Sequence, residues 1–233
     1  SVRHPHIISV LDYGFAARGQ PFFTMQLLEH AHTLQSARKT LTWEQKAQLL
    51  VQLLGALSYL HRHGILHRDL KPGNVMVLSG SEGPQIKLLD FGLALARSHV
   101  QAKPRELLGT LSYMAPELFE GRPASEASDL FAVGVLAYEL FARRHPFDRG
   151  DDAELIGSIL RSEPDWEPLR KHEALLSVVR QLLAKAEDTE TALGSDILCA
   201  ALEGYALAKV FGKGAGLEAL RGAMSARYSR KPK

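Results

Sequence analysis

Cysteine, excess charge of either sign and long apolar runs are all scarce in this chain of 233 residues. Its one cysteine, Cys199, cannot form a disulfide within the chain, which fits a reducing compartment and predicts a cytoplasmic location. The 28 basic and 26 acidic residues leave a formal net charge of +2, too small to indicate binding to nucleic acid or a charged membrane surface. No apolar run reaches the roughly 18 residues of a membrane-spanning helix, so the sequence predicts no membrane segment.

Three short motifs stand out against this ordinary background. The stretch from His67 to Asn74 reads HRDLKPGN, residues 90–92 read DFG, and residues 115–117 read APE. Apolar segments at 75–78 and 86–89 flank a turn rich in serine and glycine, which predicts a β-hairpin between the first two motifs. Such a hairpin would return Asp90 to the edge that carries Asn74, as shared metal binding requires.

In this order, the three motifs resemble the catalytic loop, the metal-binding turn and the end of the activation segment of eukaryotic-like Ser/Thr protein kinases. The resemblance implies transfer of the ATP γ-phosphate to a Ser or Thr hydroxyl of a protein substrate. It gives Asp69 the role of accepting the hydroxyl proton and places Lys71 near the γ-phosphate. Asn74 and Asp90 would hold Mg²⁺, since amide and carboxylate oxygens are ligands that this ion prefers.

Two further roles follow from the same resemblance. Arg68 would pair with a phosphorylated activation loop, although Ser98 is the only hydroxyl residue between Leu93 and Leu108. Thr110 is expected to have a structural role near the catalytic residues.

Residues 10–15 and 21–28 are predicted to be two strands joined by a turn that contains Gly19. On their own they would indicate only an apolar hairpin. By resemblance they are the last strands before the kinase hinge. Met25 would then be the gatekeeper, the backbone groups of Gln26 and Leu28 would face the adenine edge, and Met76 would complete the nucleotide site.

The resemblance predicts an α+β, protein-kinase-like fold made mostly of the helical C-lobe. Residues 1–30 would be residual N-lobe strands and hinge, 31–190 the C-lobe, and 191–233 a divergent segment with helices at 196–211 and 217–228. The Gly-rich loop, the third-strand lysine and the helix C glutamate of the family are absent from these 233 residues. We therefore expect an N-terminally truncated domain that needs the missing N-lobe segment as a partner and is weak or inactive alone.

Two helices are predicted around the catalytic loop. The first begins at Thr42, where Gln45 three residues later forms a capping-box pattern, and ends before Gly64. The second begins near Ser125 and carries Asp129, which resembles the helix F aspartate that accepts catalytic-loop N–H bonds. The alternative for Asp129 is a first-turn acid that complements the helix dipole.

Two ambiguous features remain. His61 and His63 could suggest zinc, but their spacing suits neither helix face and no Cys or acidic partner completes a site, so His61 is expected to pack at the helix end. Glu117 usually pairs with an arginine in this family, and Glu190 stands at that position here. Either another arginine, such as Arg221 or Arg227, pairs with Glu117, or this end of the C-lobe is more loosely packed.

Two other function classes stay open. A non-catalytic, kinase-like scaffold would fit the missing N-lobe but has no need for Asp69, Lys71, Asn74 and Asp90 together. A small-molecule phosphotransferase of related fold shares the Asp and Asn positions, but Lys71 and the segment 109–117, which looks built to hold a peptide, disfavour it. Binding of Mg²⁺-ATP, followed by transfer assays on protein and on small hydroxyl substrates, separates the three.

Overall fold

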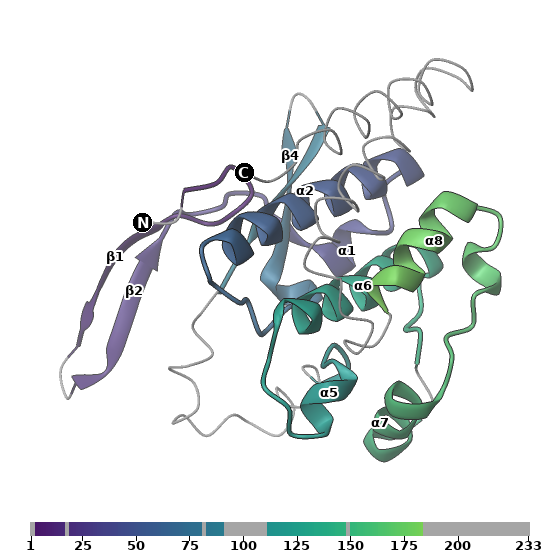
Figure 1. The fold of residues 1–233 in the computed structure, drawn as a ribbon. Coiled ribbons are helices and arrows are strands. Elements are labelled where there is room, and N and C mark those ends of the chain that lie inside the picture. The colour runs from purple at the N-terminus through teal and green to yellow at the C-terminus, as the bar shows by residue number, and fades with distance from the viewer. Residues whose placement is uncertain (1–2, 17–18, 81–82, 91–110, 148–149, 184–233) are drawn as a thin grey trace, which may run out of the picture.

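The computed structural model describes residues 3–16, 19–80, 83–90, 111–147 and 150–183 (Figure 1). An extended β-hairpin, β1 and β2, projects from a body in which helices pack against a small second sheet. Both sheets are antiparallel, with no helix alternating regularly between parallel strands, which is an α+β arrangement and confirms the predicted fold class.

The projecting hairpin pairs β1 (Val10–Phe15) with β2 (Pro21–Met25) in an antiparallel sheet. Met25 pairs with Val10, the first residue of β1, so the residues after Met25 have no further strand partner in this sheet. The predicted strand over 21–28 therefore ends three residues early. Gln26 still donates its backbone N–H to the carbonyl of Ser9, which fixes the exit of the chain from the hairpin.

The second sheet has the order β3 (His32–Thr33), β4 (Val75–Gly80) and β5 (Gly83–Leu88). The hairpin predicted between the first two motifs is confirmed, with longer strands than the sequence indicated. Its register sets Val75 opposite Leu88, so the residues just before β4 and just after β5 meet at one end of the hairpin.

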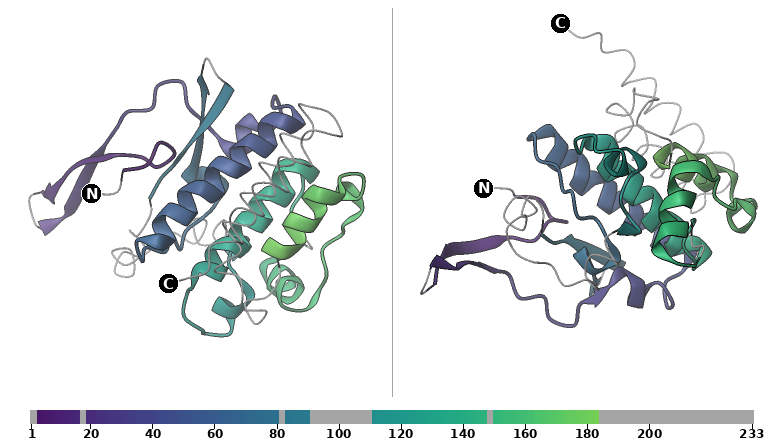
Figure 2. Two further views of the ribbon diagram at one scale, coloured as in Figure 1. Left: turned by 45° about the horizontal axis from the view of Figure 1, so that its top comes forward. Right: turned by 90° about the horizontal axis from the view of Figure 1, so that it is seen from below.

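Two long helices form the centre of the body. They are α2 (Trp43–Arg62) and α6 (Glu126–Ala142), and Figure 2 shows α8 (Glu173–Leu182) lying beside α6 on its other side. The smaller helical elements are α1 (Leu34–Ala37), η2 (Pro72–Asn74), α5 (Pro116–Phe119), α7 (Asp152–Arg161) and η3 (Glu167–Leu169). No described helix is both long and apolar enough to cross a membrane.

The predicted start of α2 is confirmed by its capping box. The Gln45 N–H donates to Thr42 Oγ1 over 3.3 Å, and the Thr42 N–H donates to Gln45 Oε1 over 2.9 Å. Gly64, with φ +69°, follows the helix and donates its N–H to the His61 carbonyl, as a glycine after a helix end commonly does.

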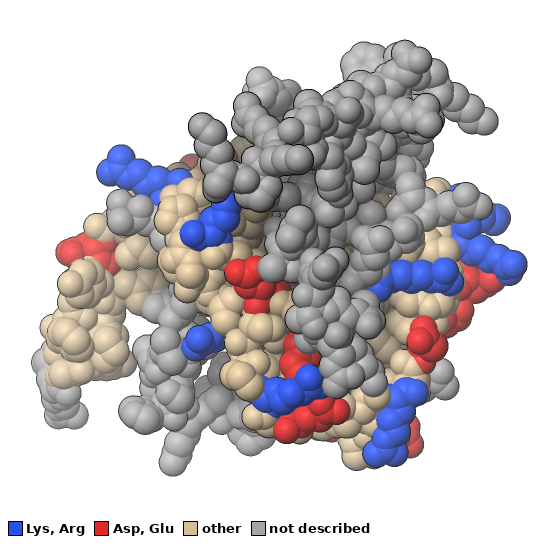
Figure 3. Space-filling model, in the orientation of Figure 1, with Lys and Arg blue, Asp and Glu red and all other residues tan. Residues whose placement is uncertain are grey.

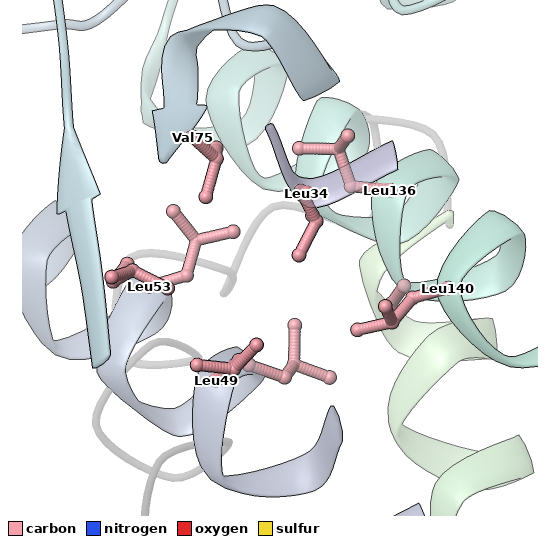
Figure 4. A pocket seen from close by; sticks show the side chains of 9 residues that line it. Leu34, Leu49, Leu53, Val75, Leu136 and Leu140 are labelled. Carbon is pink, nitrogen blue, oxygen red and sulfur yellow. The ribbon is translucent and has the colours of Figure 1, made fainter. Parts of the chain in front are cut away.

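The core below the catalytic loop is closely packed. Figure 4 shows Leu49 and Leu53 of α2 facing Leu136 and Leu140 of α6, with Leu34 and Val75 closing the space between them. Only about 10 Å³ is left open there, near the lower limit for one water molecule. The loop that leads into η2 and β4 is therefore supported by a closely packed apolar core, the apolar base.

Candidate active site

The loop of residues 67–74, which resembles the family's catalytic loop, is hydrogen-bonded to one carboxylate on α6. Asp129 Oδ2 accepts the backbone N–H of His67, and Oδ1 accepts that of Arg68, both over 2.8 Å. The Asp129 side chain is only 3 % exposed, so these are charge-assisted bonds in a poorly solvated place. The prediction that Asp129 anchors the loop is confirmed, in preference to a role limited to the helix dipole.

His61 takes part in the same network, which the sequence interpretation missed. Its Nε2 lies 2.9 Å from Asp129 Oδ2, and the residue is 8 % exposed at the last turn of α2. The prediction that His61 merely packs at the helix end was therefore incomplete. A signal was present, because His61 ends one predicted helix and Asp129 begins another, but only packing of α2 against α6 joins them.

The backbone on both sides of the site adopts the left-handed conformation. Arg68 has φ +67° and Asp90 has φ +57°, values that are uncommon outside glycine and cost about 1–3 kcal/mol each. The bond from the Arg68 N–H to Asp129 helps hold the first of these turns. The Arg68 side chain is exposed to solvent. Because Arg68 directly precedes Asp69, the turn at Arg68 sets the direction in which the chain enters Asp69.

Asp69, Lys71 and Asn74 form one polar cluster. Lys71 Nζ lies 3.0 Å from each carboxylate oxygen of Asp69. Asn74 Nδ2 donates to the Asp69 carbonyl over 2.7 Å and to Asp69 Oδ2 over 3.1 Å. Because both bonds use the amide nitrogen, the amide oxygen of Asn74 faces another direction and can accept a donor or a cation.

His67 ties this loop to the hairpin end that carries Asp90. Its Nε2 is 2.8 Å from the Leu89 carbonyl, and its Nδ1 accepts the Asp69 N–H over 3.3 Å, which together define a neutral ring protonated at Nε2. Burial lowers the pKa of His67 from its ordinary value of 6.5, with the carboxylates of Asp129, Asp69 and Asp90 acting in the opposite direction. The neutral ring is therefore the form that the fold favours.

The hairpin brings Asp90 next to Asn74. The Leu89 N–H donates to the Asn74 carbonyl over 2.9 Å, and Leu89 precedes Asp90 directly. Asp69, Asn74 and Asp90 are thus gathered at one end of β4 and β5, as the hairpin prediction required. Amide and carboxylate oxygens in such a set have the chemistry that suits Mg²⁺.

The residues predicted to contact the nucleotide do not all share one cavity. A cavity of about 370 Å³ lies between the β1–β2 hairpin and Asp90, and Met25 forms part of its wall. Gln26, Leu28 and Met76 are not among the described residues that line it. Gln26 is exposed, while Leu28 and Met76 are half-buried, and Met76 pairs with Thr33 and Lys87 in the second sheet.

A second hollow, of about 40 Å³, adjoins the catalytic loop. Arg68 and Asp69 line it together with Tyr113, Met114 and residues of α5 and α6. The Tyr113 hydroxyl donates to Glu139 Oε2 over 2.7 Å. Burial and the adjacent Glu139 carboxylate raise the pKa of Tyr113 far above its ordinary range, so the phenol stays a donor.

Comparison with known proteins agrees with this geometry. The family model described as "Protein kinase domain" matches residues 1–191. The chain belongs to the protein kinase family. This finding confirms the resemblance drawn from the three motifs.

Individual relatives of this kinase domain come from bacteria and animals. It is 34 % identical over 190 residues to Serine/threonine-protein kinase pkn3 of Myxococcus xanthus, covering 78 % of this chain and 35 % of that protein. It is 35 % identical over 189 residues to Serine/threonine-protein kinase PkaA of Streptomyces coelicolor, covering 79 % of this chain and 34 % of the relative. It is 34 % identical over 193 residues to human Calcium/calmodulin-dependent protein kinase type 1B, covering 79 % of this chain and 54 % of that protein. The aligned part spans about a third of the two bacterial relatives and about half of the human one.

Several predictions for this kinase domain lie outside the described residues. They concern Ser98 and Thr110 of the activation segment, Glu190, and Cys199 with the two helices expected after residue 195. The division of the chain at residues 30 and 190 also stays a prediction.

Proposed function

We propose that this chain supplies most of the catalytic machinery of a Ser/Thr protein kinase, which transfers the ATP γ-phosphate to a protein hydroxyl with Mg²⁺. The observation that carries the proposal is the cluster of Asp69, Lys71 and Asn74, held by Asp129 and adjoining Asp90. Phosphoryl transfer depends mainly on such positioning and on charge stabilisation, because the protein makes and breaks few covalent bonds itself.

Asp69 is the proposed proton acceptor. Its side chain is 14 % exposed, so it reaches the surface while two neighbours fix its orientation. Lys71 balances the carboxylate charge and is proposed to contact the γ-phosphate of bound ATP. A substrate hydroxyl placed beside Asp69 would give up its proton to this carboxylate as the phosphoryl group is transferred.

Asn74 and Asp90 are the proposed metal ligands. The amide oxygen of Asn74 is the atom left over after the two bonds to Asp69, and Asp90 is oriented by its left-handed backbone. Mg²⁺ bound there would neutralise charge on the phosphates. The nucleotide itself is proposed to contact Met25, Met76 and the backbone of Gln26 and Leu28.

The β1–β2 hairpin supports the proposed need for an N-lobe segment. In the described ranges, the exposed large apolar side chains all lie on this hairpin or just after it: Val10, Leu11, Tyr13, Phe15, Phe22, Phe23 and Leu27. In Figure 3 this projecting part is mostly tan, whereas blue and red groups are frequent among the coloured atoms elsewhere on this face. A two-stranded ribbon is marginally stable in water by itself, so a segment that covers this apolar surface would stabilise it. We propose that the segment with the Gly-rich loop, the lysine and the glutamate does so.

Other parts of the proposal rest on sequence. The exposed Arg68 is proposed to pair with a phosphorylated group on the activation segment, and the substrate is proposed to be a protein with Ser or Thr. The single cysteine supports a cytoplasmic location.

The test is transfer of labelled phosphate from Mg²⁺-ATP to a generic Ser/Thr protein substrate, with the chain joined to an N-lobe segment of a relative. Asp69→Asn is expected to lower the rate by at least about 100-fold, because general-base and orienting contributions are lost. Asp152→Asn is the matched control, since it makes the same charge change at an exposed position in the first turn of α7. Replacing Asn74 with Ala should raise the Mg²⁺ concentration needed for half-maximal rate.

Two results would contradict the proposal. Binding of Mg²⁺-ATP with equal, negligible transfer by the parent and Asp69→Asn would indicate a non-catalytic scaffold. Transfer to small hydroxyl compounds but not to proteins would indicate a small-molecule phosphotransferase. The chain without an N-lobe segment should turn over slowly or not at all.

A further inference from the structure

Glu117, in the first turn of α5, is a buried acid that needs a partner. It is 4 % exposed, and within the described ranges no lysine, arginine or histidine lies within ion-pair distance of its carboxylate. A buried carboxylate is costly unless hydrogen bonds replace its hydration. Among the described residues, Ser128 supplies such a bond, because its hydroxyl donates to Glu117 Oε1 over 2.7 Å.

The Ser128 hydroxyl is used in two directions at once. Besides donating to Glu117, its oxygen accepts the Ser125 N–H over 3.1 Å and so completes the capping box of α6. Ser128 is 6 % exposed, so water competes little for either bond. The hydroxyl therefore donates to Glu117 and accepts from the Ser125 N–H, and the Ser125 hydroxyl also lies 3.5 Å from it.

Because Ser128 adjoins Asp129, its bond to Glu117 also links α5 to the residue that holds the catalytic loop. Asp129 holds the backbone of His67 and Arg68, while Ser128 holds the helix that follows Tyr113. Adjacent residues in the first turn of α6 thus fix two segments that are separate in sequence.

The two fixed segments face each other across the hollow of about 40 Å³. Its wall includes Asp69 of the catalytic loop, Tyr113 and Leu118 of the facing segment, and Ser128 and Asp129 at their junction. A shift of the facing segment would change its distance from Asp69, and with it the position of a protein substrate held against this segment. The oxygens of Asn74 and Asp90 belong to the hairpin end and would not move with it.

We propose that Ser128 is a positioning residue that couples the segment 111–119 to the catalytic loop and thereby sets binding of the protein substrate. The inference rests on the proposed kinase function. It assigns a positioning role to the serine hydroxyl that donates to Glu117.

The test compares Ser128→Ala with the parent in the chain joined to an N-lobe segment. Loss of a bond to a charged acceptor predicts a rise of about tenfold in KM for the protein substrate. KM for Mg²⁺-ATP should change by less than about twofold, a split that general destabilisation would not produce. Ser128→Thr, which keeps the hydroxyl, should restore most of the loss. Ser158→Ala is the matched control, because Ser158 is also buried, at 8 % exposure, but lies in α7.

Hydrogen exchange gives a readout that needs no enzymatic activity. Backbone amides of 111–119 should exchange at least about tenfold faster in Ser128→Ala than in the parent, while those of 66–74 stay within about twofold. If the parent transfers no phosphate, the proposed function fails while this measurement still decides the coupling. Unchanged exchange in 111–119, or equal changes in both KM values, would overturn the inference. If Ser128→Ala does not fold, Glu117→Gln replaces it, and the same split between the two KM values is expected.

Discussion

His61 and Asp129 lie 68 residues apart in the chain, yet His61 Nε2 is 2.9 Å from Asp129 Oδ2. The same oxygen accepts the His67 N–H, and its partner oxygen accepts the Arg68 N–H. One carboxylate thus joins the end of α2, the start of α6 and the loop that carries Asp69. The orientation of the catalytic loop depends on the packing of these two helices.

Asp129→Asn should weaken this junction strongly. The amide offers one acceptor oxygen where three donors converge, and its NH₂ group faces N–H groups. We expect a loss of about 3 kcal/mol in the free energy of unfolding, measured by urea denaturation. The rate of phosphate transfer should fall by about 100-fold, since small displacements of a catalytic group are costly. Asp152→Asn again serves as the control, and an Asp129→Asn protein as stable and active as this control would contradict the anchor.

The stability of the catalytic loop should depend on pH through His67. Its folded-state pKa is lowered by burial, so the unfolded chain binds more protons below the ordinary value of 6.5. The stabilising contribution is therefore complete above about pH 6.5 and is lost as the pH falls toward the lowered pKa.

This dependence can be measured from unfolding free energies between pH 7.5 and 5. His67→Gln, which does not titrate, should show a shallower decline than the parent. Burial also lowers the pKa values of His4 and His6, so part of the decline remains in the variant. Equal slopes for the two proteins would show that His67 does not titrate differently on folding.

Gly134 allows α8 to approach α6 closely. A Cβ at this position would lie 2.9 Å from Leu182 Cβ and 2.9 Å from Leu183 Cγ. Gly134→Ala should therefore destabilise the fold by about 1–3 kcal/mol through overpacking. Gly55→Ala is the control, because Gly55 lies inside α2 and nothing beyond its own chain neighbours and helix backbone lies within 4 Å of the added Cβ. Gly55→Ala should stabilise the fold by up to about 1 kcal/mol. Thermal unfolding of both variants measures the difference, and equal midpoints would contradict the close packing of α6 against α8.

Leu53→Ala tests the apolar base under the catalytic loop. Leu53 is 2 % exposed and faces the small cavity between α2 and α6, so truncation should cost about 2–5 kcal/mol. Leu27→Ala removes the same atoms from a side chain that is 79 % exposed and should change stability by less than about 0.5 kcal/mol. Chemical denaturation of the pair gives the comparison. Similar midpoints would mean that the packing shown in Figure 4 does not stabilise the fold.

Local patterns in the sequence predicted several elements well. The Thr42–Gln45 pattern marked the start of α2, and the two apolar runs after Asn74 predicted β4 and β5. These elements depend on bonds between residues close in the chain, so spacing and residue type suffice. The end of β2 was less predictable, because it depends on where β1 begins its pairing.

The sequence by itself determined the chemical groups and their order: the acid at 69, the lysine at 71, the amide at 74 and the acid at 90. Only the tertiary structure decided that His61 reaches Asp129 and that Ser128 reaches Glu117. A hydrogen bond acts only over about 3 Å, and the residues that meet at that distance are chosen by helix packing. No spacing along the chain encodes such a meeting.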